Sequence, residues 1–237
     1  MLSRVPVPHA AARKIQGMIL SGELRSGEKV PSQREFALSL GVSRASLREA
    51  LLTLETLGLL KTEPGRGTFV SQERPSASRN MARWRYADSY PVADVFETRI
   101  MLEGRIAGLS SQTLTEAEFQ ALETETDTME RNWESGDLLA NVEADLEFHA
   151  IIASACPNRM IVDLYQSVRD KLTETQIQPI PITEPARMRA SIAEHRRIIR
   201  ALRKRDAGGA ALEMQCHIQN TAQCAGIVFF SGGPNSD

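Results

Sequence analysis

The sequence has 237 residues, enough for two domains of ordinary size. Hydrophobic residues make up 42% and charged residues 24%, which is typical of a folded globular protein and excludes a disordered chain. The apolar runs are far shorter than the roughly 18 residues that cross a bilayer, and the N-terminus lacks the apolar core of a secretory signal. Three cysteines without paired spacing predict no disulfide framework. We therefore expect a cytoplasmic protein with no membrane partner.

The net charge of −2 conceals an asymmetry along the chain. Residues 1–85 carry 14 Lys or Arg against 7 Asp or Glu, whereas residues 86–237 carry 14 against 23. A basic segment joined to an acidic one is suited to contact with a polyanion. The N-terminal third is therefore predicted to bind nucleic acid.

The first 72 residues have the pattern of a winged helix-turn-helix. Apolar residues at helical spacing predict a helix over 7–21, a second from Ser32 to Gly41, and a third from Ser43 to Gly58. Ser32 and Glu35 form a capping box. Two short β-runs, 59–62 and 68–70, flank a Pro-Gly turn and predict a hairpin.

The rest of the chain predicts an antiparallel helical bundle. Residues 73–90 are polar and are interpreted as a linker, with a short helix around 79–85; residues 91–230 form the bundle and 231–237 a tail. The fold class is thus mainly α, with six or seven helices in the C-terminal domain. Helical patterns cover 92–111, 116–135, 138–154, 158–176, 185–205 and 207–229.

The third predicted helix carries two arginines on one face. Arg44 and Arg48 are four residues apart, about 100° around the helix from its leucine stripe. Arg34, near the start of the preceding helix, can join them across the turn. An arginine fork matches the edge of guanine or a phosphate. Such a pair is usually only solvated, but its place on the second helix of a helix-turn-helix favours DNA contact.

Two further groups of residues suit DNA. Ser43 and Ser46 lie at the positive start of the third helix, where a phosphate binds well. At the predicted hairpin turn, Gly65 and Gly67 allow close backbone approach, and Arg66 between them can enter the minor groove.

These motifs resemble the N-terminal signature of the GntR family. The resemblance is carried by PSQREFA from residue 31, GVSRASLREAL from residue 41, LGLL from residue 57 and PGRGTFV from residue 64. It implies that Arg34, Arg44, Arg48 and the wing at 65–67 contact operator DNA. Gln33 departs from the family pattern, where an acidic residue is usual, without touching the DNA-facing set.

Three of the four histidines fall on separate helices of the predicted bundle. These are His149, His195 and His217, and Asp145 lies four residues before His149, on the same helix face. Each histidine alone is more often a hydrogen-bonded or surface residue than a ligand. Together, one carboxylate and three imidazoles suit Zn²⁺, Ni²⁺, Mn²⁺ or Fe²⁺. Zinc is expected first, although nothing in the sequence selects it firmly.

The C-terminal pattern is similar to the metal-binding ligand domain of the FadR-like branch of that family, the FCD type. DLEFH at 145–149, Asn158, Glu194-His195 and the stretch 210–217 carry the likeness. It implies that Asp145, His149, His195 and His217 coordinate the ion.

Three residues are candidates for binding an effector. Arg99 resembles an arginine of the family pattern and could bind a carboxylate through two parallel hydrogen bonds. An intrahelical salt bridge to Glu103 is equally compatible with its position. Ser191 and Asn220 share helix faces with His195 and His217, which ordinary helix polarity also explains. The family resemblance implies a small carboxylate effector, a hydroxy acid or a sugar acid.

The expected function is a homodimeric repressor that binds a pseudo-palindromic operator and releases it when the effector binds at the metal. Two alternatives remain open. One is a metal sensor, for which the ion itself is the signal. The other is a metal-dependent hydrolase, for which only Glu194 or Glu103 could serve as the base.

Overall fold

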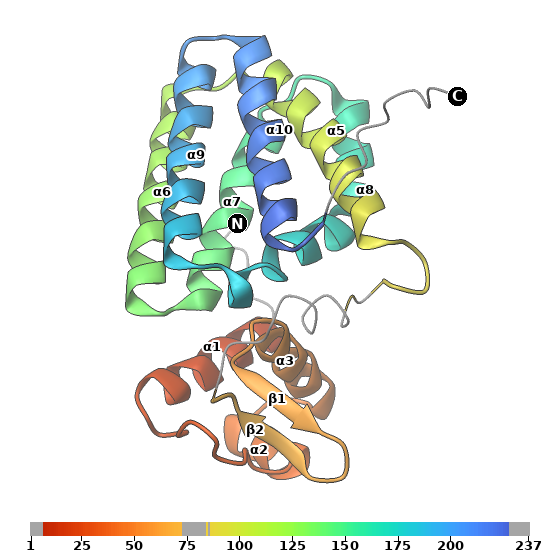
Figure 1. Ribbon diagram of the computed structural model, residues 1–237, viewed down its shortest axis with the longest axis vertical. Helices are drawn as coiled ribbons and strands as arrows, with labels where there is room; N and C mark the ends of the chain where they lie inside the picture. Colours follow the sequence, from red (N-terminus) through yellow and green to blue (C-terminus); the bar gives the residue numbers. More distant parts are fainter. Residues whose placement is uncertain (1–6, 73–83, 85, 228–237) are drawn as a thin grey trace, which may run out of the picture.

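The computed structural model describes residues 7–72, 84 and 86–227. Within them the chain forms a small N-terminal head and a larger helical body that lies above it in Figure 1. The predicted fold class is confirmed: three helices and a hairpin in the head, six α-helices in the described body. The short helix expected around 79–85 and the tail at 231–237 lie outside the described residues, except Trp84.

The head is a three-helix unit with a β-hairpin wing. Its elements are α1 (Val7–Leu20), α2 (Gln33–Leu40), α3 (Arg44–Thr56), β1 (Leu60–Glu63) and β2 (Gly67–Val70). The strands pair antiparallel, with Leu60 opposite Val70. One bridge was not predicted: Lys29 pairs with Phe69 in a stretch expected to hold only turns. This bridge fastens the loop between α1 and α2 to the wing.

Local caps set the turn between α2 and α3. Ser32 and Glu35 make the predicted capping box, and Gly41 ends α2 in the left-handed conformation at φ 69°. Ser43 then caps α3 through the amide of Ser46. Because short local signals define both ends of this turn, the sequence predicted it well.

The described residues of the body form six α-helices and one 3₁₀ turn. They are α5 (Val92–Ser110), α6 (Glu116–Ser135), α7 (Leu138–Ser154), α8 (Arg159–Ile177), η1 (Ile180–Ile182), α9 (Pro185–Arg203) and α10 (Ala207–Cys224). The 3₁₀ turn was not predicted, because its prolines indicated only a break between helices.

The last helix is shorter than the 207–229 expected from its apolar pattern. In the described part of the chain, α10 ends at Cys224, and Gly226 adopts a left-handed φ of 77°. The amide of Ile227 then donates to the carbonyl of Ala222, which closes the helix end.

The central contact of the body is between α5 and α10. Two glycines allow it: a Cβ added at Gly104 would lie 2.6 Å from Cγ of Gln215, and one at Gly108 would lie 2.9 Å from the carbonyl oxygen of Ala207. Buried apolar side chains such as Phe96 and Met214 surround this contact. Because the two helices approach closely, side chains of α5 and α10 share one buried core.

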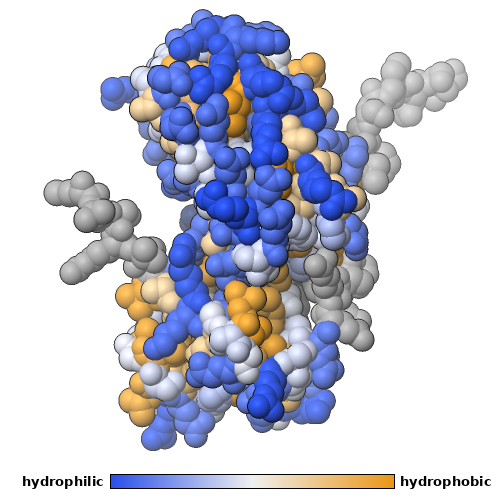
Figure 2. All heavy atoms as spheres, turned by 90° about the vertical axis from the view of Figure 1, so that its left-hand side faces the viewer, coloured by the Kyte–Doolittle hydropathy of each residue, from blue (hydrophilic) through white to orange (hydrophobic). Residues whose placement is uncertain are grey.

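The core of the head continues into the body. Leu139 and Val142 of α7 belong to the same buried cluster as Leu47 and Leu54 of α3. Figure 2 shows the face of the body over α6 and α9 covered mainly by hydrophilic residues. The head is thus seated on the end of α7 rather than joined only by the chain.

Candidate metal centre and DNA-binding surface

The predicted DNA-reading residues lie on one exposed part of the head. Arg34 on α2 and Arg44 and Arg48 on α3 are all exposed. The opposite side of α3 is buried in the core through Leu47 and Leu51. The arginines are therefore held outward by the packing of the leucine stripe.

The two serines at the start of α3 are engaged with each other. Oγ of Ser43 accepts a hydrogen bond from the amide of Ser46 at 3.0 Å, and the two hydroxyls are 2.9 Å apart. Ser43 is exposed and Ser46 is half-buried. They define the first turn of the helix beside the two arginines.

The wing presents Arg66 at its tip. Gly65 and Gly67 have φ of 72° and 115°, a region that disfavours other residues. Arg66 pairs with Glu63 and lies 5.6 Å from the ring centre of Phe69. Nζ of Lys29 lies 6.0 Å from the same ring. Sequence reasoning missed Lys29, whose only signal was its charge.

The four predicted metal ligands converge in the body. Asp145 and His149 come from α7, His195 from α9 and His217 from α10, and one potential ligand atom from each lies within 4.8 Å of the others. All three histidines are at most 3% exposed. Residues that are up to 72 positions apart thus form one buried cluster.

Asp145 joins the imidazoles of α7 and α9. Its Oδ1 is 3.1 Å from Nε2 of His195 and 3.9 Å from Nε2 of His149. Its other oxygen accepts a hydrogen bond from the side-chain amide of Gln176 at 2.7 Å. Gln176 was not predicted, because it lies on α8 and no pattern links it to the histidines.

The outward nitrogen of each imidazole has its own partner. Nδ1 of His149 lies 2.5 Å from Glu103, Nδ1 of His195 lies 2.9 Å from the carbonyl of Ser191, and Nδ1 of His217 lies 2.9 Å from Glu194. A carbonyl or carboxylate oxygen only accepts, so Nδ1 of His195 and of His217 donates and leaves Nε2 as the acceptor of each ring. Nδ1 of His149 faces Glu103 without hydrogen-bond geometry. Partners of this kind orient histidines that ligate metals.

Burial alone would keep the carboxyls neutral, but their partners outweigh it. Arg99 and His149 lower the pKa of Glu103 to about 2, and hydrogen bonds from His217 and Arg187 lower that of Glu194 to about 2. Burial and the neighbouring His195 lower the pKa of His217 to about 3. Near neutral pH the two carboxylates are therefore ionised and His217 is neutral, as metal binding requires.

The acceptor atoms of the cluster indicate whether it fits a divalent cation. Nε2 of His195, an acceptor, faces Oδ1 of Asp145, also an acceptor, and has no hydrogen-bond partner. Two acceptors this close need a proton or a cation between them. The N₃O donor set is one that zinc and other first-row divalent ions accept. The cluster fits such an ion.

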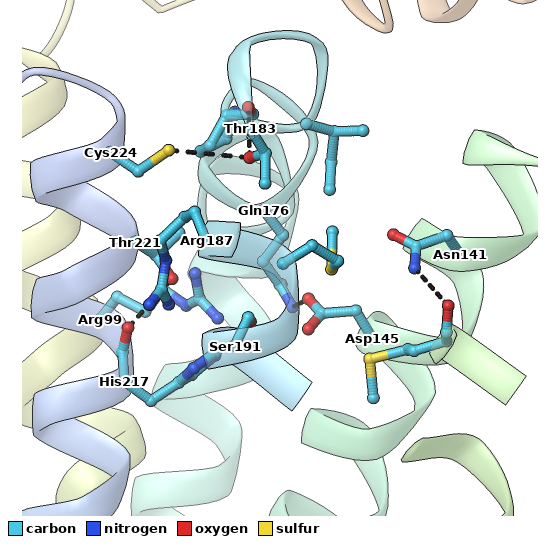
Figure 3. Close-up of a pocket in the computed structure, with 14 residues that line it drawn as sticks. Arg99, Asn141, Asp145, Gln176, Thr183, Arg187, Ser191, His217, Thr221 and Cys224 are labelled. Carbon is cyan, nitrogen blue, oxygen red and sulfur yellow. Dashed lines mark hydrogen bonds between the residues drawn. The ribbon is translucent and has the colours of Figure 1, made fainter. Parts of the chain in front are cut away.

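A cavity of about 40 Å³ adjoins the cluster. In Figure 3, Asp145 and His217 reach toward it from opposite sides, with Ser191 between them. Arg99 also lines it. The cavity walls that the sequence did not indicate come from Asn141, Gln176, Thr183, Arg187 and Thr221.

The three candidate effector residues have different surroundings. Arg99 is 1% exposed; its Nε donates to Glu103 at 2.8 Å and its Nη2 is 3.3 Å from Nε2 of His149. The bridge to Glu103 therefore coexists with a position in the cavity wall. Asn220 does not line this cavity: its amide donates to Glu194 at 2.8 Å.

A winged helix-turn-helix joined to a helical body with a possible metal site is the architecture of a DNA-binding transcription regulator. The model for bacterial regulatory proteins of the gntR family matches residues 9–70, and the model for the FCD domain matches residues 94–220. The chain belongs to the GntR family, in the FadR-like branch with an FCD C-terminal domain.

Curated relatives agree with this assignment. The chain is 29% identical over 210 residues to the HTH-type transcriptional regulator LutR of Bacillus subtilis (strain 168), covering 86% of this chain and 94% of the relative. It is 29% identical over 220 residues to the Uxu operon transcriptional regulator of Escherichia coli (strain K12), covering 88% and 82%. The chain is thus a transcription regulator and not an enzyme, which removes the hydrolase alternative.

The solved structure of E. coli McbR/YncC has the same fold. It matches with a TM-score of 0.53 and 18% identity, over 94% of this chain and 98% of that one. In the part of the chain that the structure describes, no helix has the length and apolar character needed to cross a bilayer.

Proposed function

We propose that the chain is a repressor released from its operator by a small carboxylate that binds at a divalent metal in the body. Asp145, His149, His195 and His217 would hold the ion, zinc first and Ni²⁺, Mn²⁺ or Fe²⁺ as alternatives. The observation that carries the proposal is the convergence of these four side chains, with every outward Nδ1 facing a carbonyl or carboxylate oxygen. When bound, the ion supplies a Lewis-acidic anchor for an oxygen ligand.

Charge favours an anionic effector. Arg99 and Arg187 bring two positive charges to the cluster, and Glu103, Asp145 and Glu194 bring three negative ones. A divalent cation would leave the group with a formal excess of one positive charge. A buried excess charge is costly unless it is paired, so a carboxylate is the expected partner.

The cavity favours a compact effector. A volume of about 40 Å³ holds only a few water-sized groups. Hydroxyls of Ser191 and Thr221 line it, and the guanidinium groups of Arg99 and Arg187 stand at its wall. Of the two predicted effector classes, a small hydroxy acid matches this combination of size, charge and hydroxyl partners, whereas a sugar acid would need a larger cavity. We propose direct contact for Arg99 and Ser191; Asn220 acts through Glu194, which it hydrogen-bonds.

DNA recognition is assigned to the exposed face of the head. We propose that Arg34, Arg44 and Arg48 contact the major groove, that Ser43 and Ser46 contact phosphates, and that the wing at Gly65, Arg66 and Gly67 contacts the adjacent minor groove. A homodimer would place two copies of α3 one DNA turn apart on a pseudo-palindromic operator.

An operator titration tests the function. The operator is first selected by the purified protein from a pool of random duplexes, and its affinity is then measured by fluorescence anisotropy. Small hydroxy and sugar acids are screened by thermal shift, and each hit is added with and without a chelator. The proposal predicts that a hit weakens operator binding only in the metal-loaded protein. A response to metal alone, with no carboxylate effective, would instead establish a metal sensor.

A further inference from the structure

A buried glutamine joins the head to the body. Gln16 on α1 is 2% exposed. Its Nε2 donates to Oδ1 of Asp137 at 2.5 Å, and its Oε1 accepts from the backbone amide of Leu139 at 3.0 Å. Both ends of one side-chain amide are therefore used on a single short segment, the start of α7.

This contact completes the cap of α7. The first amides of a helix have no partners within the helix. Asp137 satisfies one of them by accepting from Ala140 at 2.9 Å, and Gln16 satisfies another, that of Leu139. A side chain of the head is thus part of the N-terminal cap of a body helix.

The same helix carries two of the proposed metal ligands. Leu139 and Val142 on α7 lie in the core of the head, while Asp145 and His149 lie in the metal cluster. Leu139 and Asp145 are separated by about 9 Å along the axis, at 1.5 Å per residue. The helix has neither glycine nor proline between Leu138 and Ser154, so its two ends move as one rigid unit.

We infer that Gln16 is a positioning residue that fastens the DNA-binding head to the metal-carrying helix. A shift of α7 at Asp145 and His149 is then passed directly to the head through its capped end. Two ion pairs of this interface, Arg13 and His9 with Glu143, lie nearer the surface, where ion pairs contribute little. The docking part of the inference stands on its own, and the metal part rests on the proposed function.

Hydrogen exchange tests the docking in the full chain. Gln16→Met keeps the side-chain volume but removes both hydrogen bonds; Gln120→Met, at an exposed position of α6, is the matched control. We expect at least about tenfold faster exchange in the peptide that covers the first turn of α7 for Gln16→Met only. Unchanged exchange there would overturn the docking role. If Gln16→Met does not fold, Gln16→Glu replaces the donor to Asp137 with a second carboxylate. Repulsion between the two carboxylates is expected to speed exchange of the same peptide relative to Gln120→Glu, and unchanged exchange would again overturn the docking role.

Operator titration tests the coupling. In the parent, the hydroxy acid found in the thermal-shift screen is expected to weaken operator binding by about tenfold, and in Gln16→Met by less than about threefold, with metal content unchanged. A lesion that only weakened the fold would leave the ratio as in the parent. A folded Gln16→Met with the parental ratio overturns the coupling while the proposed function stands. A parent that holds no metal refutes the proposed function, and the exchange experiment still decides the docking.

Discussion

The head and the body place their functional residues in opposite ways. In the head, Arg34, Arg44, Arg48 and Arg66 lie within 33 consecutive positions and are exposed. In the body, Asp145, His149, His195 and His217 come from three helices; the three histidines are buried and Asp145 is half-buried. A surface that reads a large polyanion needs local geometry and exposure, whereas a site that holds a small ion needs long-range packing and burial. Substitutions in the head and in the body can therefore test the two kinds of site separately.

The largest effect is expected from removal of one buried ligand. His195→Ala takes away an imidazole whose Nδ1 is fixed by Ser191 and whose Nε2 faces Asp145. The metal content of the purified protein should fall from about one ion per chain to nearly none, because three ligands hold the ion far less tightly. Inductively coupled plasma mass spectrometry measures it.

The fourth histidine provides the control for this substitution. His9 lies on α1, in contact with Glu143 and away from the cluster. His9→Ala should therefore retain the metal. Equal metal in His195→Ala and the parent would remove His195 from the ligand set.

A smaller loss is expected when a histidine partner is changed. Glu194→Gln removes the carboxylate that accepts from Nδ1 of His217 at 2.9 Å. Partners of ligating histidines typically contribute about 10- to 100-fold to metal affinity. Competition with a chromophoric chelator measures the change, and Glu213→Gln, a half-exposed carboxylate of α10 that pairs with Arg197, is the control. Equal affinities for Glu194→Gln and the control would mean that Glu194 does not brace the site.

On the head, a single arginine substitution should weaken operator binding without touching the metal. Arg48→Ala is expected to cost about 1–3 kcal/mol in operator binding if Arg48 contacts a base. Anisotropy titration measures it, with Arg200→Ala, an exposed arginine of α9, as the control. An unchanged titration curve for Arg48→Ala would take this residue out of the DNA-contacting set.

The smallest effect is expected from a helix cap of the head. Ser32→Ala removes the capping box at the start of α2. The free energy of unfolding of the head should fall by about 1 kcal/mol, measured by urea denaturation. Ser135 lies at the C-terminal end of α6 and caps no helix N-terminus. Ser135→Ala should therefore leave the free energy of unfolding of the head unchanged. A head as stable as the parent would show that α2 does not depend on its cap.

The same contrast explains what the sequence could predict. The head was predictable almost element by element, since Ser32, Gly41 and Ser43 act on neighbouring backbone. The predicted end of α10 was wrong. Apolar residues recur at helical spacing beyond Cys224, but the helix ends there and Gly226 adopts a left-handed φ. The position of Lys29 was not predicted because a β-bridge pairs it with Phe69, which is 40 positions away.

In the body, histidine spacing together with the family resemblance indicated the ligand set, but not what surrounds it. Gln176 and Arg187 reach the site from α8 and α9 only through the packing of the bundle. The sequence indicated Glu103 as a possible partner of Arg99, and Glu103 and Glu194 as possible bases, but not that the two carboxylates lie behind His149 and His217. No local pattern marks a carboxylate as the partner of a distant imidazole.

The central claim is that Asp145 and three buried histidines bind one divalent ion. Isothermal titration calorimetry of chelator-treated protein with Zn²⁺ tests it most directly, with the Asp145→Ala variant alongside. We expect saturable binding at about one site per chain in the parent and none in the variant. Binding that is absent from the parent, or equal in both proteins, would contradict the claim.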